Sequence, residues 1–279
     1  MFCLFVANWR DIMHCLLAYF QQDTKEYTMK HTRMLSLLIV GVFLGISLPG
    51  QTSERVLFVG NSYTYFWSLH LQVQALAESR GQKIEPRASF SGGVNLGQHW
   101  RGERNLQSRQ LVNSGNYDVV IFQDHSRRAI DDPDSLLYFG NLWAEAAQEA
   151  GAEVYFYVTW SREWDPYMQE PILNTYRKVA RENDAKIIPV GPAWERAHEL
   201  RPDLRLYDPD GSHPSNIGTY LSACVIYGVL TGESPIGLTN RVELGKITGP
   251  DFHFLNRVTS EDALFCQKVA SEILKTYRP

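Results

Sequence analysis

The sequence predicts a three-layer α/β/α domain around a mainly parallel β-sheet, spanning residues 53–279. Short runs of β-branched and aromatic residues alternate along the chain with longer segments whose apolar residues recur at helical spacing. This alternation is typical of βαβ units, in which a helix connects each strand to the next parallel strand. No internal repeat, low-complexity segment or linker interrupts the region, so we expect a single domain.

Five short runs between turn-forming residues are expected to form the strands. Four of them are rich in apolar, strand-favouring side chains, and the second is a weaker candidate. The five runs lie at residues 55–59, 83–88, 119–122, 153–159 and 186–190. Segments with apolar residues three or four positions apart are expected to form the helices. They lie at residues 67–80, 135–150, 171–181, 215–232 and 260–277.

Several of these helices carry boundary signals of their own. Gly81 and Gly151 directly follow the first two helices, where a glycine in the left-handed conformation commonly ends a helix. Pro171 opens the third helix, since the first turn requires no N–H partner from that residue. Ser215 is a typical N-cap and Gly232 a typical stop for the helix between them.

Composition excludes some classes of function. The chain carries 27 Lys and Arg against 31 Asp and Glu among 279 residues, and a formal net charge of −4. Nucleic acid is therefore not an expected partner, because such binding needs clustered basic side chains that displace counterions. The four cysteines (Cys3, Cys15, Cys224 and Cys266) form no Cys-x-x-Cys pair and no zinc-like spacing. We expect no cofactor, and the pairing of the cysteines and the oligomeric state stay open.

The amino terminus, residues 1–52, has the pattern of an export signal. A basic flank at residues 30–33 precedes an apolar run at residues 34–48, which ends in proline, glycine and polar residues. The run is shorter than the ~20 residues of a membrane span, so we expect export to the periplasm or medium with no stable span after signal removal. Met29 or Met34 would then be the true start, preceded by an upstream extension. A permanent anchor and an amphipathic helix remain alternatives.

Two distant segments supply a serine, an aspartate and a histidine. Ser62 follows the first strand, whereas Asp210 and His213 share a Gly- and Pro-rich loop before a late helix. A serine hydroxyl becomes a nucleophile only with an imidazole base that a carboxylate orients. An aspartate three residues before a histidine in a tight loop can accept from Nδ1–H and leave Nε2 for the serine. Each residue alone is an ordinary turn residue, but together they predict an acyl hydrolase.

The predicted topology supports a shared site for these residues. Ser62 follows the first strand, Gln123 the third and Trp160 the fourth. Ligands of such sheets bind beyond the carboxyl ends of the strands, where all these positions should gather.

Gly60-Asn61-Ser62 together with Asp210-x-x-His213 resembles the first and last signature blocks of the SGNH/GDSL hydrolase superfamily, over residues 55 to 232. Asn61 stands where many members have Asp. The resemblance implies a flavodoxin-like sheet and an activity like that of secreted esterases, lipases and carbohydrate deacetylases. It also implies that Ser62 is the nucleophile, His213 the general base and then acid, and Asp210 its orienting group.

The same resemblance implies an oxyanion hole built from several N–H donors. Its backbone donors would be Ser62 and a glycine of Ser91-Gly92-Gly93, with Gly92 the closer match and Gly93 its rival. The third block departs from the usual Gly-x-Asn-Asp and reads Phe122-Gln123-Asp124-His125-Ser126. It is similar to the Gln-containing block of the sialate O-acetylesterase-like branch, so Gln123 is the expected third donor and His125 its rival.

Asn61 and Trp160 are expected to contact the substrate, a small-molecule or carbohydrate ester. Aromatic rings such as Trp160, and His99 with Trp100, could stack on sugar rings, although such side chains more often pack in a core. A metal site formed by His99, His125 and His213 would lack any helical His-x-x-x-His spacing, and no metal is expected.

The sequence thus favours an exported serine esterase that hydrolyses short-chain acyl esters, including carbohydrate O-acetyl esters, through an acyl-enzyme. An acyltransferase with the same triad would use a sugar hydroxyl in place of water. The altered third block also suits a carbohydrate-binding relative without catalysis. Residues 233–259 match no functional motif.

Overall fold

The computed structural model describes residues 53–245 and 249–277, which form an α/β/α unit around one parallel sheet. Its strands are β1 (Glu54–Gly60), β2 (Ile84–Phe90), β3 (Val119–Phe122), β4 (Glu153–Tyr157) and β5 (Lys186–Ile188). They lie in the order β2-β1-β3-β4-β5, and every neighbouring pair is parallel. This order is that of flavodoxin-like folds, so the predicted fold class is confirmed.

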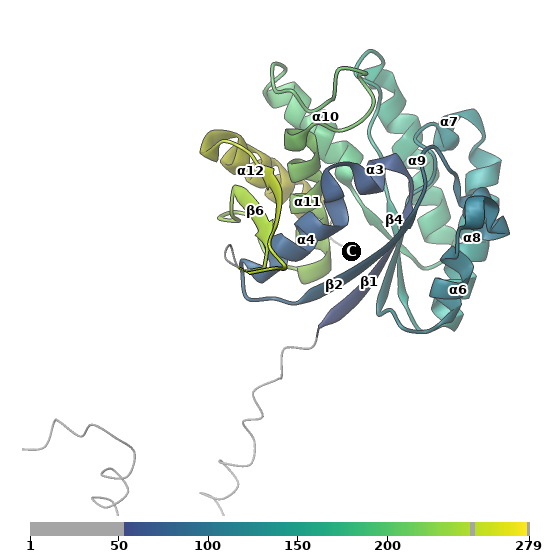
Figure 1. Cartoon of the computed structure of the whole chain (residues 1–279). Helices are drawn as coiled ribbons and strands as arrows, with labels where there is room; N and C mark the ends of the chain where they lie inside the picture. Colours follow the sequence, from purple (N-terminus) through teal and green to yellow (C-terminus); the bar gives the residue numbers. More distant parts are fainter. Residues whose placement is uncertain (1–52, 246–248, 278–279) are drawn as a thin grey trace, which may run out of the picture. The chain divides into compact units, whose positions relative to one another are not determined.

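Helices cover both faces of the sheet (Figure 1). One layer contains α4 (Leu69–Glu78), α10 (Val190–Leu200), α11 (Asn216–Thr231) and α12 (Ser260–Thr276). The other contains α5 (Leu96–Arg101), α6 (Ser108–Asn113), α7 (Arg128–Asp131), α8 (Pro133–Glu149) and α9 (Gln169–Glu182). Alternate residues of a strand point to opposite faces, so Val56 and Phe58 of β1 enter the first core, whereas Leu57 and Val59 enter the second.

The five predicted strands and the five predicted helices are all present, with shifted ends. Ser215 accepts hydrogen bonds from the N–H groups of Ile217 and Gly218, and Gly232 ends α11 with φ +70°. Val190, expected to end β5, instead begins α10, a helix that the sequence did not predict. Gly191 and Pro192 look like helix breakers, but both lie in the first turn, where a missing N–H costs little.

The predicted helix at residues 67–80 is broken near its start. A short helix, α3 (Ser62–Tyr65), and a 3₁₀ turn, η1 (Phe66–Ser68), precede α4. Trp67 and Ser68 have φ of +50° and +52°, a left-handed conformation that is strained for residues with a side chain. Gln72 supports this bend by donating from Nε2 to the Trp67 carbonyl at 2.7 Å.

The segment without a motif forms a hairpin of β6 (Arg241–Leu244) and β7 (His253–Arg257). Asn256 on β7 donates from Nδ2 to Gln72 Oε1 at 3.0 Å, and both residues are buried. The hairpin therefore stabilises the glutamine that holds the bend after Ser62.

The export signal and the pairing of the cysteines are the remaining features that the sequence raised. The expected export signal lies in residues 1–52, outside the described residues. In the part of the chain that the structure describes, none of the helices is long and apolar enough to cross a membrane. Cys224 and Cys266 are both buried free thiols.

Candidate active site

Ser62 lies at the carboxyl end of β1, as the first residue of α3. The turn requires Gly60, because a Cβ there would collide with Thr64 Oγ1 and Gln123 Oε1. Asn61 caps α3 by accepting from the Tyr63 N–H at 3.1 Å. The tight turn thus places the serine side chain at the rim of the sheet.

The structure brings Ser62, His213 and Asp210 into one hydrogen-bonded row. His213 Nε2 lies 2.9 Å from Ser62 Oγ, and His213 Nδ1 lies 2.5 Å from Asp210 Oδ2. The Phe66 ring stacks on the imidazole, with ring centroids 4.4 Å apart and planes 14° apart. The ring therefore has one nitrogen directed at the hydroxyl and the other at the carboxylate.

The loop that carries His213 is closed by the carboxylate itself. Asp210 Oδ1 accepts from the N–H groups of Ser212 and His213, each at 2.9 Å. Gly211 adopts φ +61°, and its missing side chain leaves room for the Trp164 ring. Partial burial acts to raise the pKa of Asp210, but its hydrogen bonds from His213 and Ser212 hold it below the ordinary value. Asp210 is therefore ionised at neutral pH.

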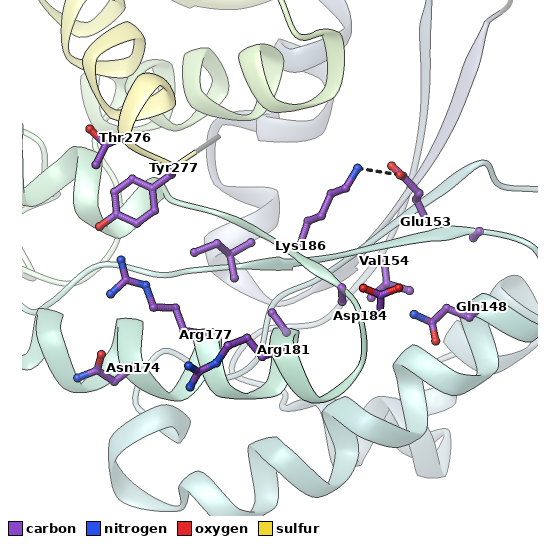
Figure 2. A pocket seen from close by; sticks show the side chains of 14 residues that line it. Gln148, Glu153, Val154, Asn174, Arg177, Arg181, Asp184, Lys186, Thr276 and Tyr277 are labelled. Atoms are coloured by element: carbon purple, nitrogen blue, oxygen red, sulfur yellow. Dashed lines mark hydrogen bonds and ion pairs between the residues drawn. The ribbon is translucent and has the colours of Figure 1, made fainter. Parts of the chain in front are cut away.

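A cavity of about 370 Å³ opens beside these side chains. Its lining comes from the loops after β1, β2, β3 and β4, and from the Asp210–His213 loop. The lining residues are Asn61, Ser62, Tyr63, Tyr65, Phe66, Gly92, Gly93, His125, Ser126, Arg162, Ser212 and His213. A larger cavity of about 1140 Å³ lies at the amino ends of β4 and β5 and shares none of these residues (Figure 2).

Backbone N–H donors are available beside the serine. Neither the Ser62 N–H nor the Gly92 N–H has a hydrogen-bond acceptor among the described residues. Arg104 Nη1 donates to the Gly92 carbonyl at 2.7 Å and so holds the peptide at this turn. Gly93 also lines the cavity, and its φ of +67° lies in the left-handed region that favours a glycine.

Gln123, the expected third donor, points into the protein instead. Its Oε1 accepts from the Asn61 N–H and from Thr64 Oγ1, each at 3.0 Å, and its Nε2 donates to the Asp124 carbonyl. The side chain is only 1% exposed and does not line the cavity. Its amide joins the β1 turn to the β3 turn at a buried position away from the cavity, so the Gln123 assignment is corrected to a structural role.

His125, the rival of Gln123, lines the cavity. Its Nδ1 accepts from the Arg127 N–H at 3.4 Å, which leaves the hydrogen of the neutral ring on Nε2. Burial lowers the pKa of His125, and the nearby Arg128 and Arg162 lower it further. The ring is therefore a neutral N–H donor at physiological pH.

Asn61 and Trp160, the predicted substrate-binding residues, are both buried, and of the two only Asn61 is among the residues that line the cavity. Asn61 is buried and donates from Nδ2 to the carbonyls of Val94 and Asp124, at 2.9 and 3.3 Å. Trp160 is 1% exposed and lies between the rings of Tyr63 and Trp194, with centroids 4.4 and 3.9 Å away. Both side chains hold neighbouring segments of the site together, Asn61 through these carbonyls and Trp160 through its stacked rings and its Nε1–H bond to the Ser212 carbonyl at 3.0 Å.

His99 is also a supporting residue. Its Nε2 donates to the Gly60 carbonyl at 2.8 Å, and its Nδ1 lies 2.6 Å from Ser108 Oγ. Burial lowers the pKa of His99 to about 4, so the ring is neutral. Both nitrogens are occupied, and the described residues contain no cluster of His, Cys, Asp or Glu that could hold a metal ion.

Arg162 and Ser126 line the cavity but were missed by the sequence reasoning. Each follows a strand, Ser126 after β3 and Arg162 after β4, so the rule that pointed to Ser62 could have found them. Arg162 Nη2 donates to Ser126 Oγ at 2.8 Å.

Asp124 should make stability depend on pH. Burial raises its pKa to about 6, although the N–H groups of Leu96 and His125 donate to Oδ1 at 2.9 and 2.6 Å. Between its ordinary value of 3.8 and about 6, the folded protein binds more protons at this group than the unfolded chain. This contribution to stability is thus complete below pH 3.8 and is lost as the pH rises through about 6.

Asp124→Asn keeps the accepting oxygen but cannot ionise. The free energy of unfolding of the variant minus that of wild type should therefore be roughly 2–3 kcal/mol higher at pH 7 than at pH 4. Urea unfolding of both proteins at the two pH values measures this difference. A difference that is the same at both pH values would show that Asp124 does not titrate as described.

The fold is similar to that of several proteins of known structure. No protein-family model and no curated protein matches the sequence. Among solved structures, a DUF4886 family protein from Bacteroides uniformis superposes with a TM-score of 0.65 at 18% identity, covering 80% of this chain and 95% of the other. A candidate SGNH hydrolase from Slackia heliotrinireducens superposes with a TM-score of 0.51 at 24% identity, covering 63% and 98%.

The fold is that of the SGNH hydrolases. The acetyl xylan esterase AlAXEase has it too, with a TM-score of 0.52, 18% identity and coverage of 63% of this chain and 99% of that one. In this chain, the loops at the carboxyl ends of the strands of the SGNH fold bring Ser62, His213 and Asp210 together.

Proposed function

We propose that this protein is a serine ester hydrolase of the SGNH/GDSL superfamily that works through an acyl-enzyme. One observation carries the proposal: Ser62 Oγ lies 2.9 Å from His213 Nε2, while Asp210 holds His213 Nδ1. A serine, an imidazole and a carboxylate in this order can generate the nucleophile that ester cleavage needs.

In the acylation step, His213 Nε2 takes the hydroxyl proton as Ser62 Oγ attacks the ester carbonyl. The ionised Asp210 fixes the ring with its hydrogen on Nδ1 and stabilises the imidazolium that forms. His213 then gives the proton to the leaving alcohol, and the acyl group stays on Ser62. In the second step, His213 deprotonates a water molecule, which attacks the acyl-enzyme and releases the acid.

The negative oxygen of each tetrahedral intermediate needs preorganised donors. This proposal assigns three donors: the Ser62 N–H and the Gly92 N–H, which have no acceptor among the described residues, and the Nε2–H of His125, a residue that lines the cavity. Such donors stabilise the transition state without reorganisation at the moment of reaction. The proposed third donor is a histidine rather than the glutamine typical of the sialate O-acetylesterase-like branch.

The size of the cavity supports a short acyl group. A volume of about 370 Å³ beside Ser62 lies near the lower end of the ~300–1,000 Å³ typical of ligand pockets. Acetyl and similar esters, including O-acetyl groups on carbohydrate, fit this space. The shared fold of an acetyl xylan esterase is consistent with such substrates.

Covalent labelling tests the proposal directly. A fluorophosphonate is expected to add one equivalent to the protein, with the adduct on the peptide that contains Ser62, because only an activated serine attacks the phosphorus. Intact-mass spectrometry followed by peptide mapping measures both the stoichiometry and the site. Ser62→Ala should show no adduct, and Ser271→Ala, at a serine of equal 8% exposure, should be labelled fully. An unlabelled wild-type protein would favour a binding protein without catalysis.

A further inference from the structure

A cationic side chain lies in the same cavity as Ser62. Arg162 lies in the loop after β4, and its guanidinium is fixed by hydroxyl groups from three other segments. Nη1 donates to the Tyr63 hydroxyl and to Ser212 Oγ, and Nη2 donates to Ser126 Oγ at 2.8 Å. These bonds orient the guanidinium at a defined place in the cavity wall.

All the partners of Arg162 are neutral. No carboxylate within the described residues forms an ion pair with it, whereas Arg55, Arg128 and Arg201 each pair with an aspartate. In the larger cavity, Lys186 is likewise paired, with Glu153 at 2.8 Å (Figure 2). A half-buried guanidinium without a counterion is costly, since its charge loses hydration and gains no opposite charge in return.

The guanidinium still has unused donors. Its hydrogen bonds occupy three of the five N–H groups of an arginine, and Nε–H and one Nη2–H have no partner among the described residues. Nε and a terminal nitrogen of a guanidinium present parallel N–H groups whose spacing matches the two oxygens of a carboxylate.

We propose that Arg162 binds a carboxylate carried by the ester substrate, so that the enzyme prefers anionic esters. This inference rests on the proposed function, because it places the anion in the cavity where Ser62 would attack. The carboxylate can belong to the acyl part or to the alcohol part of the ester. Its charge supplies the counterion that the protein itself does not provide.

Two pairs of esters that differ only in charge separate these sources. For the acyl part, 4-nitrophenyl hemiglutarate is compared with 4-nitrophenyl methyl glutarate. For the alcohol part, 4-acetoxybenzoate is compared with its methyl ester. For each ester, the rate without enzyme at the same pH is subtracted, because the carboxylate of the hemiglutarate also attacks its own ester. The ratio of kcat/KM within each pair is then compared between wild type and variant.

The wild-type enzyme should prefer the anionic member of at least one pair by about 10- to 100-fold, the range expected for hydrogen bonds to a charged group. Arg162→Met should abolish this preference, mainly by raising KM for the anionic member, so that turnover of the anionic ester falls at least about 10-fold more than turnover of its neutral partner. Arg162→Lys should keep part of the preference, because lysine retains the positive charge but lacks the two parallel N–H groups of a guanidinium. Arg101→Met, which removes an exposed arginine paired with Glu103, is the control for net charge.

Equal turnover of both members of each pair by the wild-type enzyme would overturn the inference. So would an equal loss of activity on neutral and anionic esters in Arg162→Met, which would mean that Arg162 only holds the loops together.

Calorimetry with glutarate distinguishes this inference from the proposed function. Ser62→Ala should bind glutarate, and the Ser62→Ala, Arg162→Met double variant should bind it at least about 10-fold more weakly. Binding that depends on Arg162, in a protein that hydrolyses no ester, would support the anion site and overturn the esterase. Ester hydrolysis by wild type with no charge preference, together with no Arg162-dependent binding of glutarate, would support the esterase and overturn the anion site.

Discussion

Replacing Ser62 or His213 with alanine is expected to lower kcat for 4-nitrophenyl acetate by about 10⁴- to 10⁶-fold. Without Ser62 there is no oxygen to carry the acyl group. Without His213 the hydroxyl, 2.9 Å from Nε2 in the intact protein, keeps its proton at neutral pH. The loss is measured as the steady-state rate at which the visible absorbance of the released nitrophenolate increases.

The double variant gives a sharper test of a shared role. Because serine and imidazole act as one unit, removing both should slow turnover about as much as removing either alone. Ser271→Ala and His198→Ala are matched controls, since both lie on helices away from the cavity lining. Turnover close to wild type in both single variants would refute the acyl-enzyme mechanism, provided that circular dichroism shows folded proteins.

Replacing His125 with phenylalanine is expected to lower kcat by about 10²- to 10³-fold, with little change in KM. Phenylalanine preserves the ring in the cavity wall but removes the Nε2–H donor that the Arg127 N–H fixes in place. A donor to the tetrahedral oxygen stabilises the transition state more than the ground state, so the effect falls on kcat. Initial rates with 4-nitrophenyl acetate over a range of concentrations separate the two parameters.

His125→Asn is the companion variant, because a side-chain amide restores an N–H donor near the same position. It should recover part of the activity that phenylalanine loses. If His125→Phe retains a kcat within about threefold of wild type, the ring is only a wall of the cavity, and the oxyanion is held by the backbone donors alone.

Much of the fold could be predicted from local pattern. The alternation of short runs with helical periodicity located all five strands. Four are mainly apolar, as buried parallel strands require, whereas β2 is partly exposed and carries Glu85 and Arg87. The hairpin at β6 and β7 was not predicted, since its strands have only four and five residues and the residues of β7 do not alternate between apolar and polar. The order β2-β1-β3-β4-β5 was expected only through the resemblance to a known family, since periodicity carries no information on which strands are neighbours.

Some residues of the candidate site could likewise be predicted from the sequence, and others could not. Ser62, Asp210 and His213 could be named because Ser62 follows a strand, and Asp210 and His213 are three residues apart in the loop before α11, a spacing that suits a carboxylate orienting an imidazole. Gln123 and His125 could not be distinguished, although only two positions separate them. A turn after a strand directs successive side chains to different surroundings, and the Asn61 and Thr64 donors that bind Gln123 come from another segment.

By itself, the sequence determined the βαβ architecture and the residues that can perform acyl chemistry, since both depend on side-chain type and spacing along the chain. Only the tertiary structure decided which polar groups face the cavity: it buries the Gln123 amide and the Trp160 ring, and it leaves the His125 ring and Arg162 at the cavity. The physical reason is that a donor is free for substrate only where no other segment satisfies it. That depends on partners far away in the sequence, which no local pattern contains.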